Sequence, residues 1–331
     1  MQHGGDLTDA VARHGAGDPP WLDLSTGINP HPWPAPEGLL RRSGWERLPG
    51  KADLGRLLRV ARSAYGIPDD AEIVAAPGSQ ALIQWLPRLA EQGSVAVLGP
   101  TYGEHAAAWR GAGLSVREIA GLDEVGDARH VVAVNPNNPD GRVIPHAGLA
   151  QAGRLCAERG GWLVVDESFA DVVPEACAAR LAAELPIVVL RSFGKFHGLA
   201  GLRLGFAVAP PPLADRIAQA LGPWAVSGPA LAVGAAALAD VAWADAMRGR
   251  LRREAEALDR VLAEAGFAPA GGTSLYRLVR HSRAASLQAA LAAEHIWVRS
   301  FDWAPDLLRF GLPQDAASRE RLRATLRTLV A

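Results

Sequence analysis

Five short apolar runs, spread through the middle of this 331-residue chain, limit most strongly what it can fold into. Polar or turn-forming residues bound each run, which is typical of a short strand buried on both faces of a sheet. Segments in which apolar residues recur at helical spacing, such as 103–112 and 147–159, lie between the runs. Such alternation predicts an α/β fold whose mainly parallel sheet is covered by helices on both faces. The runs are residues 95–98, 130–134, 162–165, 187–190 and 204–209.

The pattern changes along the chain, which predicts an arm and two domains in a chain of this length. Residues 1–44 are rich in proline and glycine and lack a clear period, so we expect an extended arm that partly joins the small domain. Residues 45–244 hold the strand–helix alternation and form the large domain. Residues 245–331 close the chain with a short α+β pattern and form the small domain.

Composition and charge exclude several classes of protein. The formal net charge is −1, and no long basic run or basic–aromatic alternation occurs, so nucleic acid is not an expected partner. The most apolar window, 225–243, is rich in alanine and is interrupted by Gly228, Pro229 and Asp240. We therefore expect a buried helix there and no membrane span.

Cysteine usage and the N-terminus bear on the compartment. Cys156 and Cys177 are the two cysteines, and neither lies in a CxxC or another metal-ligand spacing, so we expect no metal. Two thiols in a chain of this size favour a reducing compartment. The first residues contain no charged segment followed by an apolar one, as a secretory signal would. The sequence therefore predicts a cytoplasmic protein.

Lys195 lies just past the apolar run 187–190, within the segment RSFGKFHGLAGLRLG that spans 191–205. A lysine near the end of a buried strand is costly unless it is paired or used covalently. Its amine can form a Schiff base with an aldehyde. Ser192 and Arg203 are suited to an anionic group next to that aldehyde. The alternative is a solvated lysine in a glycine-rich turn.

Two other segments at strand ends carry polar or aromatic groups. Gly78, Ser79 and Gln80 open a helix, whose free N–H groups together with the Ser79 hydroxyl suit a phosphate. Tyr102 follows the run 95–98 and offers a flat face to a heteroaromatic ring. The alternatives are an ordinary helix cap and an exposed tyrosine after a turn.

An amide and a carboxylate follow the next two strands. Asn138 lies in the segment 135–141, NPNNPDG, where two X-Pro steps fix the backbone and aim its amide. Asp166 comes directly after the run 162–165 and requires a cationic partner. We expect that partner to be a protonated pyridine nitrogen. The alternatives are a proline-rich turn for the first segment and a helix cap for the second.

Taken together and in this order, these elements resemble the fold-type I aminotransferase superfamily, which uses pyridoxal 5′-phosphate (PLP). The resemblance covers most of the chain and implies that Lys195 binds the cofactor aldehyde and that Asp166 pairs with the pyridine nitrogen. It also implies that Asn138 bonds the phenolic oxygen and that Tyr102 stacks on the ring. The residues implied to hold the phosphate are Gly78, Ser79, Gln80, Ser192 and Arg203.

Within the superfamily, the chain is most similar to the branch of histidinol-phosphate aminotransferase and threonine-phosphate decarboxylase. Three features favour the decarboxylase: the start HGGD at 3–6, the segment DLSTGINP at 23–30, and DESF at 166–169. They imply PLP-dependent decarboxylation of L-threonine O-3-phosphate to (R)-1-amino-2-propanol O-phosphate, in cobalamin biosynthesis. Two alternatives remain: an aminotransferase of the histidinol-phosphate type, and a non-catalytic binding protein, which the retained lysine and aspartate disfavour.

The resemblance also implies a small phosphorylated amino acid as substrate and a homodimer, since active sites in the superfamily lie at a dimer interface. Arg309 occupies the position that grips the substrate carboxylate in the superfamily; the sequence leaves open whether it binds the carboxylate or the phosphate of the substrate. His3, Asn29 and His31 are candidates for the substrate phosphate. The alternative for these three is a solvated or structural residue of the arm.

The chain departs from the wider superfamily pattern at four places. Phe169 replaces a common tyrosine, and Gly194 replaces a common phosphate-binding serine. Leu48 stands where a tyrosine often reaches the neighbouring subunit, and Asp140 replaces a common threonine. These differences argue against efficient transamination and leave cofactor binding untouched.

Overall fold

The structure, a computed structural model, describes residues 4–39 and 42–330. It divides the chain into two compact units. The larger unit comprises residues 33–138 and 142–244, and the smaller comprises 1–32, 139–141 and 245–331. The larger unit therefore begins at Trp33 and ends at Ala244.

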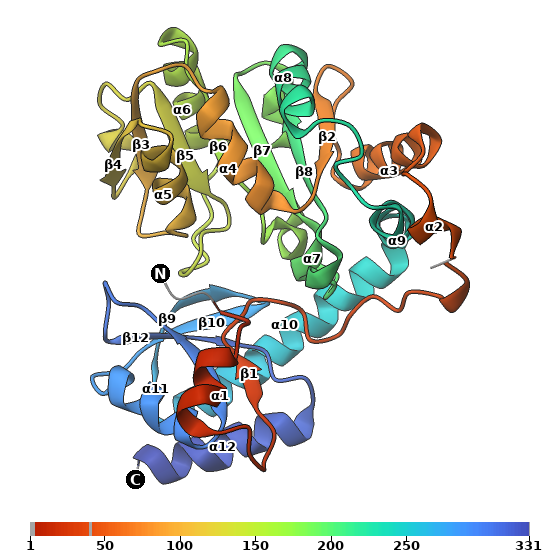
Figure 1. The fold of residues 1–331 in the computed structure, drawn as a ribbon. Helices are drawn as coiled ribbons and strands as arrows, with labels where there is room; N and C mark the ends of the chain where they lie inside the picture. Colours follow the sequence, from red (N-terminus) through yellow and green to blue (C-terminus); the bar gives the residue numbers. More distant parts are fainter. Residues whose placement is uncertain (1–3, 40–41, 331) are drawn as a thin grey trace. The chain divides into compact units, whose positions relative to one another are not determined.

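The larger unit is built on one sheet, which has seven strands within the described part of the chain. Strand β8 runs antiparallel to both its neighbours, β2 and β7, while the remaining pairs are parallel. Figure 1 shows these strands side by side. The mainly parallel sheet confirms the predicted fold class. In spatial order the strands are β2 (Glu72–Ala76), β8 (Gly205–Ala209), β7 (Ile187–Ser192), β6 (Leu163–Asp166), β5 (His130–Val134), β3 (Ser94–Leu98) and β4 (Ser115–Ile119).

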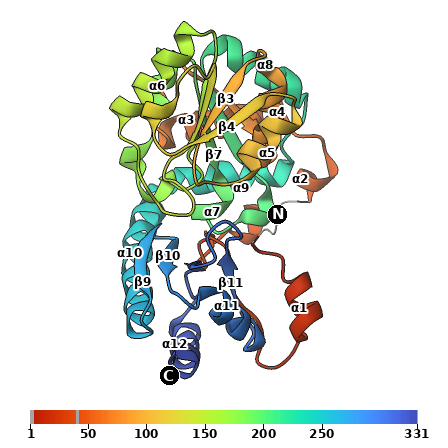
Figure 2. The same ribbon diagram turned by 90° about the vertical axis from the view of Figure 1, so that its left-hand side faces the viewer.

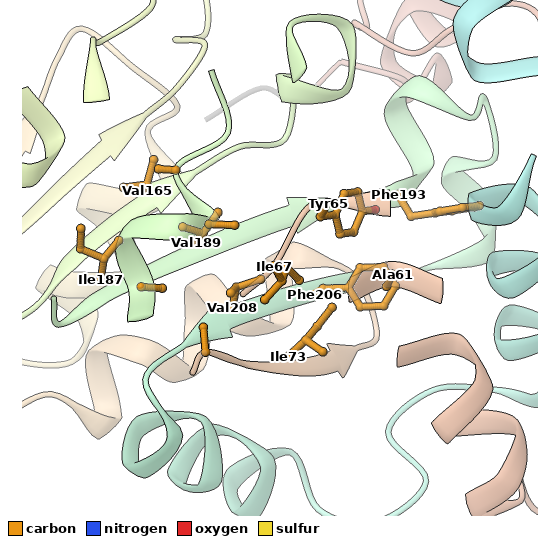
Figure 3. Packing of buried hydrophobic residues seen from close by; sticks show 14 of the residues in the cluster. Ala61, Tyr65, Ile67, Ile73, Val165, Ile187, Val189, Phe193, Phe206 and Val208 are labelled. Carbon is orange, nitrogen blue, oxygen red and sulfur yellow. The ribbon is translucent and has the colours of Figure 1, made fainter. Parts of the chain in front are cut away.

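Helices cover both faces of this sheet. Helices α3 (Lys51–Ala64), α6 (His146–Glu158) and α9 (Gly228–Ala239) contribute to one apolar cluster. Part of that cluster is drawn in Figure 3. Helices α4 (Ser79–Leu89), α5 (Glu104–Gly111) and α8 (Pro211–Leu221) contribute to the cluster on the other face (Figure 2). Because the central strands are buried on both faces, their sequences are largely apolar and do not alternate.

Short helices fill the connections of the larger unit. Two are α-helical, α2 (Ser43–Glu46) and α7 (Phe193–Phe196). The 3-10 turns are Glu37–Leu39, Leu122–Glu124, Ala170–Val172, Pro174–Ala176, Ala179–Ala183 and Ala200–Leu202. Helix α10 (Val241–Glu264) begins in this unit and continues into the smaller one.

The sheet directions bring several loops to one edge. The carboxyl ends of the parallel strands meet there, together with the start of the antiparallel strand β8. Within that edge, Gly205 is aligned with both Ala76 and Ser192, and Asp166 is aligned with Leu190. The loops that follow these strands therefore lie next to one another.

The smaller unit contains a sheet in which β1 is parallel to β11 and the other pairs are antiparallel. Its strand order is β1 (Leu22–Leu24), β11 (Ile296–Ser300), β12 (Leu307–Gly311), β10 (Tyr276–Arg280) and β9 (Ala268–Thr273). Its helices, apart from the end of α10, are α1 (Thr8–His14), α11 (Ala284–Ala293) and α12 (Ala316–Val330).

The N-terminal arm is more structured than its composition predicts. The expectation of an extended arm is wrong for residues 8–14, which form α1, and for residues 43 and 44, which begin α2. The Asp6 carboxylate accepts a hydrogen bond from the Thr8 amide at 2.9 Å, and Ala10 packs against Ala292 and Trp297. This local hydrogen bond and the packing on residues far away in the chain accompany a helix in a stretch rich in glycine and proline.

No single helix in residues 4–39 and 42–330 is long and apolar enough to cross a membrane. Helices α9 and α10 are joined with a bend of 76°, and only when taken together are they long and apolar enough for a membrane span. Eight of the twelve residues of α9 are buried.

Candidate active site

Lys195 lies in the four-residue helix α7, at the edge of the larger unit's sheet. Its Nζ is 3.5 Å from the Ser192 Oγ and 5.4 Å from the centre of the Phe169 ring. The His197 ring stacks on Phe193 at 4.2 Å and on Trp243 at 5.6 Å. A helix this short has little stability of its own, so this stacking fixes the turn that carries the lysine.

Gly194, which precedes the lysine, is required by close packing. A Cβ built there would lie 2.6 Å from the Ala200 Cα and 3.2 Å from the Leu199 carbonyl oxygen. Both neighbours are backbone atoms that cannot rotate away. This contact explains why glycine, and no serine, stands at this position.

Asp166 ends strand β6 and is buried. Its Oδ2 lies 2.9 Å from the His105 Nε2, and its Oδ1 accepts a hydrogen bond from the Ser168 amide at 2.9 Å. Burial acts to raise the pKa of this carboxyl, but the His105 hydrogen bond and charge, Ser168 and the Lys195 charge together hold the pKa below its usual range. The site therefore holds a carboxylate suited to a cationic ring nitrogen.

Tyr102 and Gln80 contact each other beside this pair. The Tyr102 hydroxyl is 3.4 Å from the Gln80 Oε1, and the Gln80 Nε2 donates to the Glu104 Oε2 at 3.2 Å. The Tyr102 ring is edge-on to His105, with centroids 6.2 Å apart. The aromatic side chain is thus held next to the Asp166–His105 pair.

The start of α4 and the segment before β8 form a cradle that only glycines allow. Gly78 has φ +85°, and a Cβ there would lie 2.9 Å from the Arg203 Nη2. A Cβ on Gly205 would lie 2.5 Å from the Ser79 amide nitrogen. Backbone N–H groups at a helix start, beside a guanidinium and the Ser192 hydroxyl, are the donors that a phosphate requires. The residues present therefore fit the phosphate of PLP.

Asn138 lies in the loop after β5, and hydrogen bonds of the preceding residues Asn135 and Asn137 fix this loop. The Asn137 Oδ1 accepts from the Thr101 hydroxyl at 2.7 Å, and its amide donates to the Pro100 carbonyl at 3.0 Å. The Asn135 Oδ1 accepts from the Ile144 amide at 2.8 Å. Asn138 itself is half-buried, at the same sheet edge as Asp166.

Arg309 belongs to the smaller unit, on strand β12. Its Nη2 donates to the Ser25 carbonyl at 2.8 Å, and its guanidinium lies 5.0 Å from the centre of the Tyr276 ring. Burial lowers the pKa of Arg309 to about 10, with the Arg299 charge acting in the same direction and Tyr276 opposing both. A buried guanidinium beside another cation favours the binding of an anion.

Arg299 is the residue of this unit that sequence reasoning missed. It is directly opposite Arg309 in the antiparallel pair β11–β12, so both side chains leave the same face of the sheet. Like charges in directly opposite positions destabilise a sheet, and an anion between them removes that cost. No local signal marks Arg299, because only the strand register pairs it with Arg309.

The other candidates of the arm have partners within the smaller unit. Asn29 is buried, and its Oδ1 accepts a hydrogen bond from the His31 amide at 2.9 Å. The His31 Nε2 lies 2.8 Å from the Glu254 Oε2. His3 lies outside the described residues, whereas Gly4 packs so closely on Ser25 that a Cβ would lie 2.5 Å from its carbonyl oxygen.

The structure thus places the predicted cofactor residues and the predicted substrate residues in different units. The predicted cofactor residues lie at one edge of the larger unit's sheet, and Arg309 and Asn29 lie in the smaller unit. His105 was also missed by sequence reasoning, because a histidine inside a helix, 61 positions from Asp166, carries no recognisable signal. The cofactor residues are Gly78, Ser79, Gln80, Tyr102, Asn138, Asp166, Ser192, Lys195 and Arg203.

Comparison with known proteins defines the class. A family model for aminotransferases of class I and II matches residues 52–324, and the chain belongs to this family. Its cofactor is PLP, as the sequence predicts. The expected relationship to this superfamily is confirmed.

Two curated relatives are similar over nearly their whole length. The threonine-phosphate decarboxylase of Sinorhizobium sp is 45% identical over 328 residues, which cover 98% of this chain and 97% of the relative. That of Pseudomonas aeruginosa is 43% identical over 329 residues, with the same coverage of both chains. The histidinol-phosphate aminotransferase 1 of Bradyrhizobium diazoefficiens is 31% identical and covers 85% of this chain and 84% of its own.

Solved structures share the fold at lower identity. The histidinol-phosphate aminotransferase from Sinorhizobium meliloti, in complex with PLP, matches with a TM-score of 0.83 at 20% identity, over 98% of this chain and 95% of its own. The L-threonine-O-3-phosphate decarboxylase from Porphyromonas gingivalis matches with a TM-score of 0.74 at 19% identity, over 93% and 99%.

Proposed function

We propose that this chain is a PLP-dependent lyase that decarboxylates L-threonine O-3-phosphate. The products are (R)-1-amino-2-propanol O-phosphate and carbon dioxide, and the reaction is a step of cobalamin biosynthesis. Two relatives named threonine-phosphate decarboxylase, 45% and 43% identical over nearly the whole chain, support this assignment. The aminotransferase relative is more distant, at 31% identity.

The opposed arginines of β11 and β12 are the observation that carries the proposal. Arg309 is 7% exposed and lies directly opposite Arg299 on the same face of the sheet. Two guanidinium groups so placed are matched by a substrate with two anionic groups, a carboxylate and a phosphate. L-Threonine O-3-phosphate carries both on a four-carbon skeleton.

The larger unit supplies the cofactor-binding groups. When bound, PLP acts as an electron sink for the bond that breaks at the substrate's α-carbon. Asp166, held as a carboxylate by His105, keeps the cofactor's ring nitrogen protonated. The cradle of Gly78, Ser79 and Arg203 holds the phosphate of the cofactor.

Lys195 has two tasks in this account. When PLP is bound, the Lys195 ε-amine would hold its aldehyde, and in its protonated form the same amine would be the proton donor to the substrate's α-carbon. One proton is consumed and one carbon dioxide is released, so charge and atoms balance. Phe169, 5.4 Å from Lys195, places no hydroxyl beside it, unlike the tyrosine expected of an efficient aminotransferase.

We also propose a homodimer in the cytoplasm. Trp45 and Leu48 are 68% and 67% exposed, which is costly for large apolar side chains in an isolated chain. Leu48, Pro49 and Gly228 line a cavity of about 640 Å³ at this surface. A second copy covering these residues would bury them, and light scattering of the purified protein measures whether the mass is that of a dimer.

The proposed activity is tested by product analysis. Purified holoenzyme is incubated with L-threonine O-3-phosphate, and with L-threonine as the control that lacks only the phosphate. We expect 1-amino-2-propanol O-phosphate by mass spectrometry from the first, and at least tenfold slower turnover of the second, on the order of one lost charged contact. Equal rates would contradict a phosphate-binding role for the arginine pair.

A further inference from the structure

A cluster of buried charged residues lies just inside the active-site edge of the larger unit. The Arg191 guanidinium donates through Nη1 to the Glu167 Oε2 at 2.9 Å and through Nη2 to the Asp171 Oδ1 at 2.7 Å. The side chains of Arg191, Glu167 and Asp171 are 3%, 0% and 6% exposed. None of these residues belongs to the proposed cofactor-binding set.

Each member of this cluster is next to, or two positions from, a residue of the site. Glu167 follows Asp166, Arg191 precedes Ser192, and Asp171 is two positions after Phe169. The backbone adds to this link, because the Glu167 amide donates to the Leu190 carbonyl at 2.8 Å. The ion pairs therefore join the end of β6, the end of β7 and the turn between them.

The last two side chains of β7, Arg191 and Ser192, lie on opposite faces of the sheet. Successive side chains of a strand point to opposite sides of the sheet. The Arg191 guanidinium lies 4.3 Å from the centre of the Tyr65 ring, and Tyr65 packs on Phe206 (Figure 3), whereas Ser192 lies beside Lys195. Arg191 thus anchors the strand end from the face opposite the cofactor.

Burying this cluster of ionisable side chains costs free energy compared with burying apolar side chains. Three buried ionisable side chains are costly to desolvate, and burial raises the pKa of the Glu167 carboxyl, so an apolar core of similar volume is often at least as stable. Within the described residues, the Arg191 Nε has no hydrogen-bond partner. Bulk stability is therefore a weak explanation of this arrangement.

We propose that Arg191, with Glu167 and Asp171, forms a positioning cluster that sets the distance between Asp166 and the Ser192–Lys195 turn. The two groups must reach opposite parts of one rigid ring, the pyridine nitrogen and the aldehyde. A misplacement of about 1 Å can cost on the order of 100-fold in rate. The inference rests on the proposed cofactor contacts of Asp166, Ser192 and Lys195, and it is independent of which substrate is used.

The chemistry of the contacts suggests a graded set of variants. Lysine at position 191 keeps the charge and cannot donate to both carboxylates as a planar fork. In Glu167→Gln the amide NH₂ faces a donor, because Glu167 accepts hydrogen bonds on both oxygens, from Arg191 and from the Ala178 amide. Asp171→Asn retains the Oδ1 acceptor. Glu118→Gln, which breaks an exposed pair with Arg110, is the matched control.

The experiment measures PLP affinity of the apoprotein, the pH midpoint of the bound cofactor's absorption, and kcat and KM for L-threonine O-3-phosphate. For Arg191→Lys and Glu167→Gln we expect roughly tenfold or more weaker PLP binding, a shifted midpoint, and a kcat reduced about 10- to 100-fold with KM nearly unchanged. Asp171→Asn changes these quantities less, and Glu118→Gln leaves them at the wild-type values.

A purely structural role gives a different pattern. It would lower the thermal unfolding temperature of the apoprotein while PLP affinity, the absorption midpoint and kcat stayed at wild-type values, and that result would overturn the proposal. If Arg191→Lys does not fold, the isosteric Glu167→Gln decides by the same criteria. PLP affinity and absorption need no substrate, so failure of the proposed decarboxylation would leave this test intact.

Discussion

The His105 Nε2 lies 2.9 Å from the Asp166 Oδ2, and the two side chains are 1% and 4% exposed. Burial acts to raise the pKa of Asp166, and the hydrogen bond and charge of His105 are the largest influences that lower it. Helix α5 and strand β6 are thereby coupled through the one carboxylate that the cofactor ring requires. Among the groups that lower the pKa of Asp166, His105 therefore contributes most to keeping the carboxyl charged.

Replacing this histidine by phenylalanine, His105→Phe, should shift the acid side of PLP binding to higher pH. A carboxyl whose pKa is depressed remains ionised as the pH falls towards about 4, and its contribution is lost only below that. Without His105 the burial of Asp166 is less opposed, so its pKa rises and the carboxylate is neutralised earlier. PLP affinity measured from about pH 4 to 8 reports this shift. His146→Phe, at an exposed histidine, is the control. If the loss of PLP affinity at low pH occurs at the same pH in His105→Phe as in the wild type, His105 does not influence the pKa of Asp166.

Lys195 should carry the cofactor. The sequence has one other lysine, Lys51, which is exposed at the start of α3, so the assignment reduces to two positions. Borohydride reduction followed by peptide mapping should place the pyridoxyl group on Lys195. Lys51→Ala should retain the reducible cofactor, and Lys195→Ala should lose it. A label on Lys51 would refute the assignment.

Gly194→Ser should destabilise the Lys195 turn. The added Cβ would lie 2.6 Å from a backbone carbon of Ala200, and relieving such overlap costs about 1–3 kcal/mol. We expect a lower thermal unfolding temperature and weaker PLP binding, even though serine is the residue that many relatives in the wider superfamily use for phosphate. Gly201→Ser is the control, because no described residue lies within 4 Å of a Cβ there. Equal thermal unfolding temperatures of the two variants would contradict this prediction, because they would mean that the backbone of residues 199–200 moves aside at little cost.

Arg309→Lys should lower kcat/KM by about tenfold to a hundredfold, equivalent to one charged hydrogen bond of about 1.5–3 kcal/mol. Lysine cannot make two parallel bonds to an oxyanion, and burial with the nearby Arg299 charge would also depress its pKa. The loss should therefore grow as the pH rises. Arg299→Lys should show a loss of the same kind. PLP affinity, measured by absorbance, should stay at the wild-type value in both, and wild-type kcat/KM in Arg309→Lys would remove this residue from the substrate site.

The sequence predicts the central strands well and the sheet edges poorly. Strand β5 spans residues 130–134, as its apolar run predicts, because a strand buried on both faces is apolar throughout. Strand β4 was not expected, since it lies at the sheet edge with mostly exposed side chains and an irregular pattern. Strand β7 extends to Ser192, two residues past its apolar run, and Arg191 tolerates burial there because two carboxylates pair with it.

The site shows the same limit. Asp166, Gly78 and Lys195 lie at or within three residues of the end of a strand, so local sequence marks them. Arg299 and His105 act through partners that only the register of β11–β12 and the packing of α5 bring near. Pairings between residues far apart in the chain leave no pattern in a single sequence.

The most direct test of the central claim is the yield of carbon dioxide per active site. Holoenzyme is incubated with carboxyl-labelled L-threonine O-3-phosphate and PLP, with no keto acid added. We predict carbon dioxide release over many turnovers, with the cofactor still present as PLP at the end. Conversion of the cofactor to pyridoxamine phosphate in a single stoichiometric event, with further turnover only after addition of a keto acid, would contradict the account and identify an aminotransferase.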